Sequence, residues 1–229
     1  MKFAILSDIH SNLEAFQTVL ADIQSQGVTQ IVCLGDVVGY HANPRERLQI
    51  IRDQNILCVK GNHDEYCSGE ADLPGVSPRA ARAIHWTRRQ LTDDDRQWLR
   101  DLRYTQTVAN FTMVHGTLDA PERWGYVFDP LAAAASFAFQ TTPVCFFGHT
   151  HFPLVFMHDG AAVRGGLYSQ FKLAPGKKYL VNVGSVGLPR DNNPKAAYVI
   201  FDADAGAVEL RRLDFDQSLT RQKNLAAGL

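Results

Sequence analysis

The chain has 229 residues, of which 45% are hydrophobic, and this suits a single α/β or all-β domain with a sizeable core. Its 23 Lys and Arg residues nearly balance its 24 Asp and Glu residues, so the formal net charge is −1. That balance gives no electrostatic case for a nucleic acid or an anionic membrane as a partner. No run of about 18 apolar residues predicts a membrane span. The apolar run before Ser7 is too short for the core of a signal peptide.

The four cysteines form no CxxC pair, and three of them lie inside apolar runs. This pattern is typical of reduced, buried, core-filling thiols, so it favours a cytoplasmic protein. The sequence leaves the oligomeric state open, and an oligomer is compatible with it. The cysteines are Cys33, Cys58, Cys67 and Cys145.

The first sixty residues predict the order β-α-β-α-β, which is typical of a parallel sheet with covering helices. Ser11 and Glu14 have the spacing of a capping box, so they predict a helix start, and Gly27 suits its end. Asn43 and Pro44 predict the start of the second helix. The predicted strands are residues 2–6, 31–34 and 56–59, and the predicted helices are residues 11–26 and 43–54.

Two further helices are predicted after a loop at residues 71–76. One starts at Ser77 and runs to about residue 91, and the other is capped by Thr92. The acidic triplet that follows Thr92 resembles a metal site in composition. Carboxylates in a first turn favour the helix dipole, however, and an apolar stripe continues behind them. The triplet therefore predicts a helix start and not a metal site.

From residue 105 onward the pattern changes to short strands separated by turns. An early α/β half and a strand-rich late half fit an α/β fold of two packed sheets with flanking helices, in one domain spanning residues 1–229. The polar residues from about Gln217 are expected to be peripheral. The predicted elements are strands at residues 105–108, 111–114, 144–147, 153–157, 179–183, 197–201 and 208–213, and a helix at residues 129–139.

Five apolar runs end in aspartate, asparagine or histidine, and no cysteine stands at these positions. In open α/β sheets the carboxyl ends of the strands form the rim at which ligands bind. A single Asp there is more often a turn or helix cap, and a single His is more often packed or solvent-facing. The recurrence of the pattern favours one shared site. The strand-end residues are Asp8, His10, Asp36, Asn62, His63, Asp64, His115, His149 and His151.

These side chains have the chemistry of a metal centre. Residues i and i+2 of an extended segment point the same way, so Asp8 can pair with His10, and His149 with His151. Oxygen and imidazole donors suit manganese, which we favour, with iron, zinc or nickel as alternatives. The set is too rich in imidazole for a dedicated calcium or magnesium site. Aspartate can bridge two cations, whereas imidazole cannot easily do so.

In these motifs the sequence resembles the calcineurin-like metallophosphoesterase family, from residue 1 to about residue 190. The resemblance implies a four-layer α/β/β/α sandwich and a phosphoesterase site with two divalent metal ions. It also implies that His63 is the general acid and that Asp36 bridges the metals. The implied ligand sets are Asp8, His10, Asp36 and His151 for one metal, and Asp36, Asn62, His115 and His149 for the other.

Such a site can hydrolyse a phosphate ester. Two cations can clamp both oxygens of an in-line displacement, and a hydroxide that bridges them is the expected nucleophile. His63 would protonate the leaving oxygen, and Asn62 could also hydrogen-bond a phosphoryl oxygen. Arg190 is a candidate phosphate ligand, because its guanidinium is bidentate and always charged, with a surface loop arginine as the alternative. For His41 we favour a surface position over one that faces the pocket.

One departure narrows the substrate class. Family members that dephosphorylate proteins carry Asp-Arg shortly after the central Gly-Asp, where this chain has residues 37–40, VVGY. The segment from Gly184 to Arg190 instead resembles the small bacterial phosphodiesterase-like branch. We therefore expect a small phosphodiester or nucleotide substrate. The alternatives are a phosphomonoesterase or protein phosphatase, a repair nuclease, and a non-catalytic scaffold, which should have lost ligands or the general acid.

Overall fold

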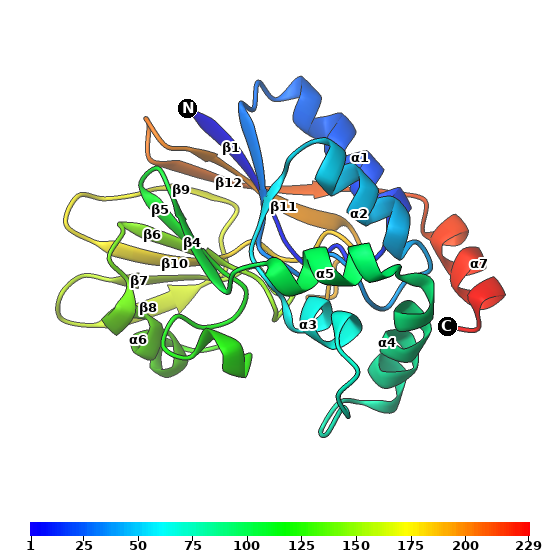
Figure 1. Cartoon of the computed structure of the whole chain (residues 1–229). Coiled ribbons are helices and arrows are strands. Elements are labelled where there is room, and N and C mark those ends of the chain that lie inside the picture. Colours follow the sequence, from blue (N-terminus) through cyan, green and yellow to red (C-terminus); the bar gives the residue numbers. More distant parts are fainter.

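The structure is a computed structural model that describes residues 1–229. Twelve strands form two six-stranded sheets, and helices flank the two sheets (Figure 1). This confirms the predicted four-layer α/β/β/α sandwich. None of its helices combines the length and the apolar character needed to cross a membrane.

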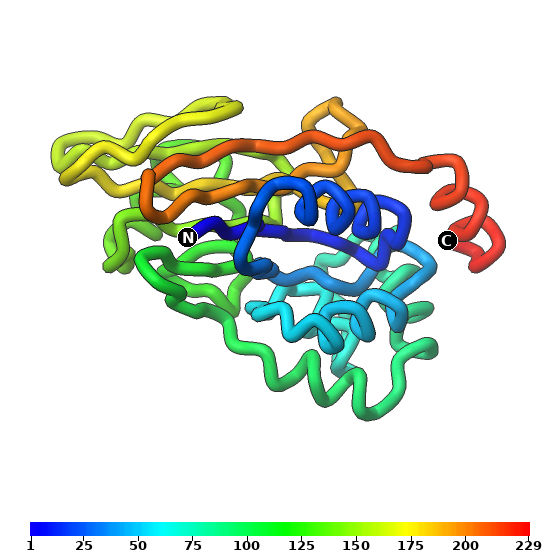
Figure 2. Tube along the Cα trace, turned by 90° about the horizontal axis from the view of Figure 1, so that it is seen from above, coloured from blue at the N-terminus to red at the C-terminus, as the bar shows by residue number.

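The first sheet has the strand order β3-β2-β1-β11-β12-β9. Its first three strands are parallel, and β11 pairs antiparallel with the other edge of β1, with Phe3 opposite Phe201. Strands from the two ends of the chain therefore lie side by side, as the blue and orange tubes of Figure 2 show, and the sheets do not follow the two halves of the sequence. The strands are β1 (Lys2–Leu6), β2 (Gln30–Cys33), β3 (Leu57–Cys58), β9 (Gln170–Lys172), β11 (Ala196–Asp202) and β12 (Ala207–Leu213).

The second sheet has the order β4-β5-β6-β10-β7-β8. Its strands β5, β6 and β10 are parallel. β4 pairs antiparallel with β5, β7 pairs antiparallel with β10, and β8 pairs antiparallel with β7. The sequence did not predict β8, which contains two glycines, or the three-residue β9. The strands are β4 (Thr105–Val108), β5 (Phe111–Val114), β6 (Val144–Phe147), β7 (Val155–His158), β8 (Val163–Gly166) and β10 (Lys178–Asn182).

Three apolar clusters fill the spaces between the four layers. Alternate residues of β1 enter different clusters: Phe3 and Ile5 face the second sheet, and Ala4 and Leu6 face the helices. Both faces of the strand are buried, which explains its unbroken apolar run. The third cluster packs α6 on the second sheet. The helices are α1 (Leu13–Ser25), α2 (Pro44–Asp53), α3 (Asn62–Ser68), α4 (Pro78–Gln90), α5 (Asp93–Asp101), α6 (Pro130–Phe139) and α7 (Gln217–Ala227), with a short 3₁₀ turn, η1 (Pro121–Arg123).

The helix starts test the capping predictions. The side chain of Thr92 accepts a hydrogen bond from the Asp95 amide at 3.1 Å, and Asp95 accepts one from the Thr92 amide at 3.0 Å. The acidic triplet is therefore a helix start, as predicted. The prediction of Ser11 as the first cap was wrong, because Ser11 has a left-handed backbone, with φ of 58°, and the next residue, Asn12, caps α1.

The end of the chain corrects another expectation. Residues from Gln217 form the helix α7, which packs on α1. Its buried Thr220 donates to Glu14 Oε2 at 2.9 Å, and Lys223 pairs with the same carboxylate.

All four cysteines are buried and free, as predicted. The cytoplasmic location inferred from them stays a prediction.

Candidate metal centre

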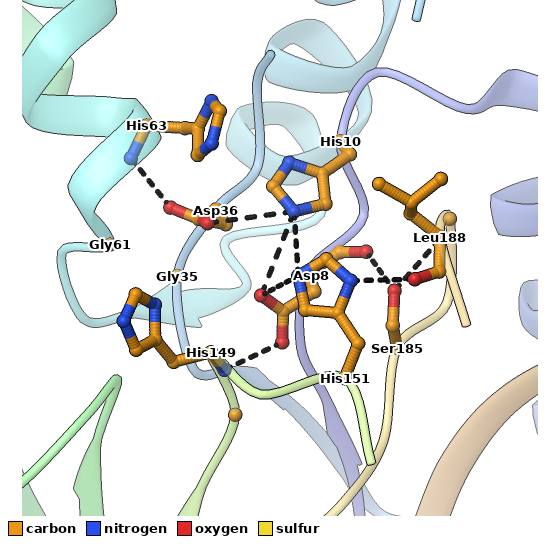
Figure 3. Close-up of polar contacts among 12 residues, drawn as sticks. Asp8, His10, Gly35, Asp36, Gly61, His63, His149, His151, Ser185 and Leu188 are labelled. Atoms are coloured by element: carbon orange, nitrogen blue, oxygen red, sulfur yellow. Dashed lines mark hydrogen bonds and ion pairs between the residues drawn. The ribbon is translucent and has the colours of Figure 1, made fainter. Parts of the chain in front are cut away.

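The predicted ligands converge where strands of both sheets end. β1, β2 and β3 run parallel in the first sheet, and β5 and β6 run parallel in the second. In Figure 3 the side chains of Asp8, His10, Asp36 and His151 turn toward one another, and the backbone amide of His149 donates to Asp8 at 3.0 Å. Hydrogen bonds and ion-pair distances connect the residues after β3 and β5 to the same group. The structure thus brings together Asp8, His10, Asp36, Asn62, His115, His149 and His151.

Four of these residues form what we call the first cluster: Asp8, His10, Asp36 and His151. One donor atom from each lies within 4.8 Å of the others, and all four residues are buried. His151 Nε2 is 3.1 Å from Asp8 Oδ1, and His10 Nε2 is 3.5 Å from Asp36 Oδ2. The cluster combines two carboxylates with two imidazoles.

The second cluster consists of Asp36, His115 and His149, with Asn62 beside them. His115 Nε2 is 3.3 Å from Asp36 Oδ2, 3.2 Å from His149 Nδ1 and 3.2 Å from Asn62 Oδ1. The same carboxylate oxygen, Asp36 Oδ2, thus lies near a histidine of each cluster.

A backbone carbonyl fixes the orientation of each of the four histidine rings. A carbonyl oxygen only accepts hydrogen bonds, so the ring nitrogen beside it carries the hydrogen and the other nitrogen keeps a lone pair. In each case that lone pair is turned toward the clusters. The pairs are His10 Nδ1 with Val38 O at 3.2 Å, His115 Nδ1 with Leu34 O at 2.8 Å, His149 Nε2 with Trp124 O at 2.9 Å, and His151 Nδ1 with Leu188 O at 2.5 Å.

The donor set fits divalent metal ions. Asp8 Oδ1 is buried and accepts no hydrogen bond, although buried carboxylate oxygens ordinarily have a partner. Imidazole lone pairs from four histidines converge on it and on Asp36. A cation satisfies such a group of acceptors. Metal-binding histidines also commonly donate their other ring N–H to a backbone carbonyl, as these four histidines do.

Five of the converging residues have a left-handed backbone. The φ angles are 53° at Asp8, 49° at His10, 52° at Asp36, 65° at His149 and 60° at His151. This conformation costs a non-glycine residue on the order of 1 kcal/mol or more and persists where the surroundings enforce it. Concentrated strain of this kind is a property of functional sites.

Asp64 is a supporting residue that the sequence analysis left without a role. Its carboxylate accepts four backbone N–H bonds, from Asp36 at 2.8 Å, Val37 at 2.9 Å, Gly61 at 3.0 Å and Val38 at 3.3 Å. It therefore ties the turn after β2 to the start of α3. Its place at the third position of the helix, after a glycine, is a capping signal that could have revealed it.

Two glycines permit the close approach of these turns. A Cβ atom on Gly61 would lie 2.1 Å from Asp36 Oδ1, and one on Gly148 would lie 1.9 Å from Ser7 Oγ. Both distances are far below van der Waals contact, so any side chain at either position would displace the carboxylate turns. Space, and not a special φ angle, is the reason for glycine here.

His63 lies beside the clusters but belongs to neither. It is the second residue of α3, and its amide donates to Asp36 Oδ1 at 2.8 Å. Its ring centroid is 4.9 Å from that of His10 and 4.6 Å from that of Tyr40. Its Nδ1 is buried without a hydrogen-bond partner. Burial lowers the pKa of His63 to about 4, so the ring is neutral at pH 7.

Arg190 and His41 have different outcomes. The Arg190 amide donates to the His151 carbonyl at 3.4 Å, and its guanidinium lies 3.4 Å from the Tyr40 hydroxyl, so the exposed side chain stands at the edge of the first cluster. The expectation of a surface position for His41 was wrong. His41 is buried against Gly187 and Asn224, because α7, which was not predicted, covers it.

The calcineurin-like phosphoesterase superfamily domain matches residues 1–206 of the chain. The chain belongs to this superfamily. It is 38% identical over 219 residues to the uncharacterized protein MJ0912 of Methanocaldococcus jannaschii, and the match covers 93% of this chain and 87% of that protein.

Two further members of this phosphoesterase superfamily are similar over most of their length. One is the crystal structure of a metallophosphoesterase from Sphaerobacter thermophilus, which is 36% identical in sequence and superposes with a TM-score of 0.88. The match covers 100% of this chain and 94% of the Sphaerobacter thermophilus chain. Phosphodiesterase YfcE of Escherichia coli K12 is 27% identical over 224 residues, 91% of each protein. The resemblance found in the sequence is thus confirmed. Membership of this superfamily identifies the chain as a hydrolase of phosphoric esters.

The electrostatics of this phosphoesterase site favour positive charge between the two aspartates. Burial disfavours the charged form of His115, but Asp36 and Asp8 outweigh it and raise the pKa of His115 to about 10, so without a cation a proton on Nε2 takes the place of the lone pair that a metal would use. Burial and the neighbouring His115 lower the pKa of His149 to about 3. Burial alone would raise the pKa of Asp8, yet His151 and His115 hold it well below its usual range. Both carboxylates thus favour a cation beside them.

Proposed function

We propose that the chain hydrolyses phosphodiesters or nucleotides at a centre of two divalent metal ions, with manganese as the favoured metal. The observation that carries this proposal is the position of Asp36 Oδ2, which lies 3.5 Å from His10 Nε2 and 3.3 Å from His115 Nε2. A carboxylate oxygen between two groups of imidazole lone pairs suits the bridging of two cations.

The two clusters supply the ligand sets. Asp36 belongs to both, so removing it affects both metals. The cations would supply Lewis-acid charge to the phosphoryl oxygens and an acidified water as nucleophile. The sets are Asp8, His10, Asp36 and His151 for the first metal, and Asp36, Asn62, His115 and His149 for the second.

His63 is the proposed general acid. Its Nδ1 is packed beside Gly39, which leaves Nε2 as the nitrogen that can reach a leaving oxygen. The free ring is neutral at pH 7, but the negative charge of a bound phosphoryl group favours the imidazolium. Proton donation to a leaving alkoxide is worth roughly 10²–10⁴ in rate.

Arg190 and Asn62 are the proposed phosphate contacts. The guanidinium of Arg190 stands beside the Tyr40 hydroxyl, and the Tyr40 ring packs on the rings of His10 and His63. This position suits a charge-assisted hydrogen bond to a phosphoryl oxygen. Asn62 has a second hydrogen-bonding group, its NH₂, available for another phosphoryl oxygen.

The substrate class follows from what stands after the central aspartate. Val37 and Val38 are fully buried, so this turn presents no charged clamp of the kind expected in protein phosphatases. The similarity to phosphodiesterase YfcE supports a diester or nucleotide substrate. The presence of every ligand position together with His63 supports an enzyme over a non-catalytic scaffold.

The test is a substrate panel with the protein loaded with Mn²⁺. The panel contains bis(p-nitrophenyl) phosphate, p-nitrophenyl phosphate, nucleotides and a phosphoserine peptide, and Asp36→Ala is the control. We expect the highest kcat/KM on a diester or nucleotide and no activity in the control. A higher kcat/KM on the phosphoserine peptide would overturn the proposed substrate class, and an inactive panel would overturn the proposed function.

A further inference from the structure

The segment after η1 holds His149 from two sides. The carbonyl of Trp124 accepts a hydrogen bond from His149 Nε2 at 2.9 Å. Two residues later, the ring of Tyr126 stacks on the imidazole of His149, with centroids 4.1 Å apart and planes 24° apart. Tyr126 therefore lies directly beside a residue of the second cluster.

Tyr126 shares its exposed position with Phe128. Their rings are nearly parallel, at 8°, with centroids 5.9 Å apart, and the residues are 52% and 54% exposed. Val127 between them is fully buried in the apolar layer under α6. Alternation along an extended segment thus places both aromatic rings on the outer side. We call this pair the aromatic step.

We propose that the aromatic step stacks the base of a nucleoside phosphate whose phosphoryl group lies at the metal clusters. This inference rests on the proposed function and specifies its substrate. The flat face of His149 carries Tyr126, while its Nδ1 points to the second cluster. Because His149 covers one face of the Tyr126 ring, the base stacks on the exposed part of the aromatic step, and the ribose passes His149 to reach the second cluster.

The edge of the site beside the first cluster has complementary chemistry. Arg190 and Tyr40 form a polar, cationic edge beside the first cluster. The site thus offers both a cationic group, beside the first cluster, and exposed aromatic rings, beside the second. A nucleotide matches both, because an anionic phosphoryl group and a planar base stand at its two ends. Base stacking on aromatic side chains also tolerates any base, so the step selects a class and not one nucleotide.

A second copy of the chain is the rival occupant. The outer face of α6 follows the aromatic step and exposes Leu131 and Phe139, at 85% and 61%. That surface is apolar, but only Tyr126 touches a residue of the clusters. Phe139 therefore provides a matched control, since it is an exposed aromatic residue at the far end of α6.

The experiment compares AMP with ribose 5-phosphate by calorimetry, using the Mn²⁺-loaded full chain. The two probes share a phosphoryl group and a sugar, and only AMP carries a base. We expect Tyr126→Ala to weaken AMP binding about tenfold, in line with the loss of one stacked base, and ribose 5-phosphate less than twofold. Tyr126→Leu, which keeps a side chain on His149, should lose AMP affinity similarly. Phe139→Ala should change neither.

The outcomes separate the two proposals. Unchanged AMP binding in Tyr126→Ala would overturn the aromatic subsite, as would equal loss of both probes together with metal, since Tyr126 would then only position His149. A dimer of the parent chain that dissociates in the Tyr126 variants would assign the step to a second copy. A parent that hydrolyses esters but binds both probes equally keeps the proposed function and overturns the subsite. A parent that binds neither probe and cleaves no ester contradicts both.

Discussion

The Nε2 atoms of His10 and His151 lie 3.1 Å apart, and the Nδ1 of each ring faces a backbone carbonyl oxygen. The carbonyls assign the hydrogens to Nδ1, so two lone pairs point at each other beside Asp8 Oδ1. This arrangement is unfavourable by itself and becomes favourable around a cation. Metal binding should therefore stabilise the fold, in addition to its proposed role in hydrolysis.

We expect saturating Mn²⁺ to raise the Tm of the chelated protein. At a free metal concentration 100 times Kd, one site contributes about 2.7 kcal/mol, which corresponds to roughly 5–11 °C for a chain of this size. Thermal unfolding with and without a chelator measures the shift, and Asp36→Ala should show little of it. An unchanged Tm in the parent would contradict a metal centre at these residues.

Asp36→Ala should lose both metals and most of the activity, because its Oδ2 lies beside both clusters. Asp36→Asn is the more conservative variant, since it retains an acceptor for the His63 amide. Asp93→Ala is the matched control: it removes only a helix-start charge worth about 0.3–1 kcal/mol. Elemental analysis decides, and a full metal content in Asp36→Ala would refute the bridging role.

His63→Ala should keep its metals and lose kcat chiefly on substrates with poor leaving groups, by roughly 10²–10⁴. Nitrophenolate needs little protonation, so p-nitrophenyl esters should suffer much less. The measurement is kcat on an alkyl and a nitrophenyl ester, with metal content determined on the same sample. Equal losses on both esters would assign His63 a structural role, and lost metal would make it a ligand.

Asp64→Ala should destabilise the fold by at least about 3 kcal/mol. The change leaves four buried backbone N–H groups without their acceptor, and each such loss costs about 1–3 kcal/mol before relaxation. Asp72→Ala removes an exposed loop carboxylate and should stay within about 0.5 kcal/mol. Urea unfolding compares the two, and similar midpoints would show that Asp64 does not secure these turns.

Glu14→Gln should lower stability at pH 7 and have no effect in acid. Burial alone would raise the pKa of Glu14, but Lys223 and Thr220 lower it below its usual value of 4.5. Its contribution is therefore fully present above pH 4.5 and is lost as the pH falls through the lowered pKa. Unfolding of parent and variant over a series from pH 7 into acid tests this, with the exposed Glu46→Gln as control. A difference that persists unchanged in acid would contradict the linkage.

The sequence predicted which side chains lie together better than it predicted the individual elements around them. Apolar runs that end in Asp, Asn or His mark the rim of a parallel sheet whatever lies elsewhere in the chain, and the seven proposed ligands lie close together as expected. The left-handed backbone of five of them was not visible, because only the assembled turns enforce it. That backbone also explains the misplaced first cap, since Ser11 shares it and Asn12 starts the helix.

The missed elements carry weak local signals. α3 has seven residues and glycine at both ends, so its residues resembled a loop. α7 buries only Thr220, and its remaining residues give no strong apolar stripe. The pairing of β1 with β11 joins residues about 200 positions apart, and no local pattern specifies it. His41 was misplaced for the same reason, because the helix that buries it comes at the end of the chain.

The turn that carries Asp8 depends on a segment much later in the chain. The Asp8 carbonyl accepts hydrogen bonds from Ser185 Oγ at 2.8 Å and from the Gly187 amide at 2.9 Å (Figure 3 includes Ser185). The predicted ligands all precede residue 152, so a ribosome finishes them before it makes these supports. A nascent chain would therefore carry every ligand and still lack the geometry to hold a metal. For the proposed metal centre, we therefore expect insertion of the metal only after the chain has been made through Gly187.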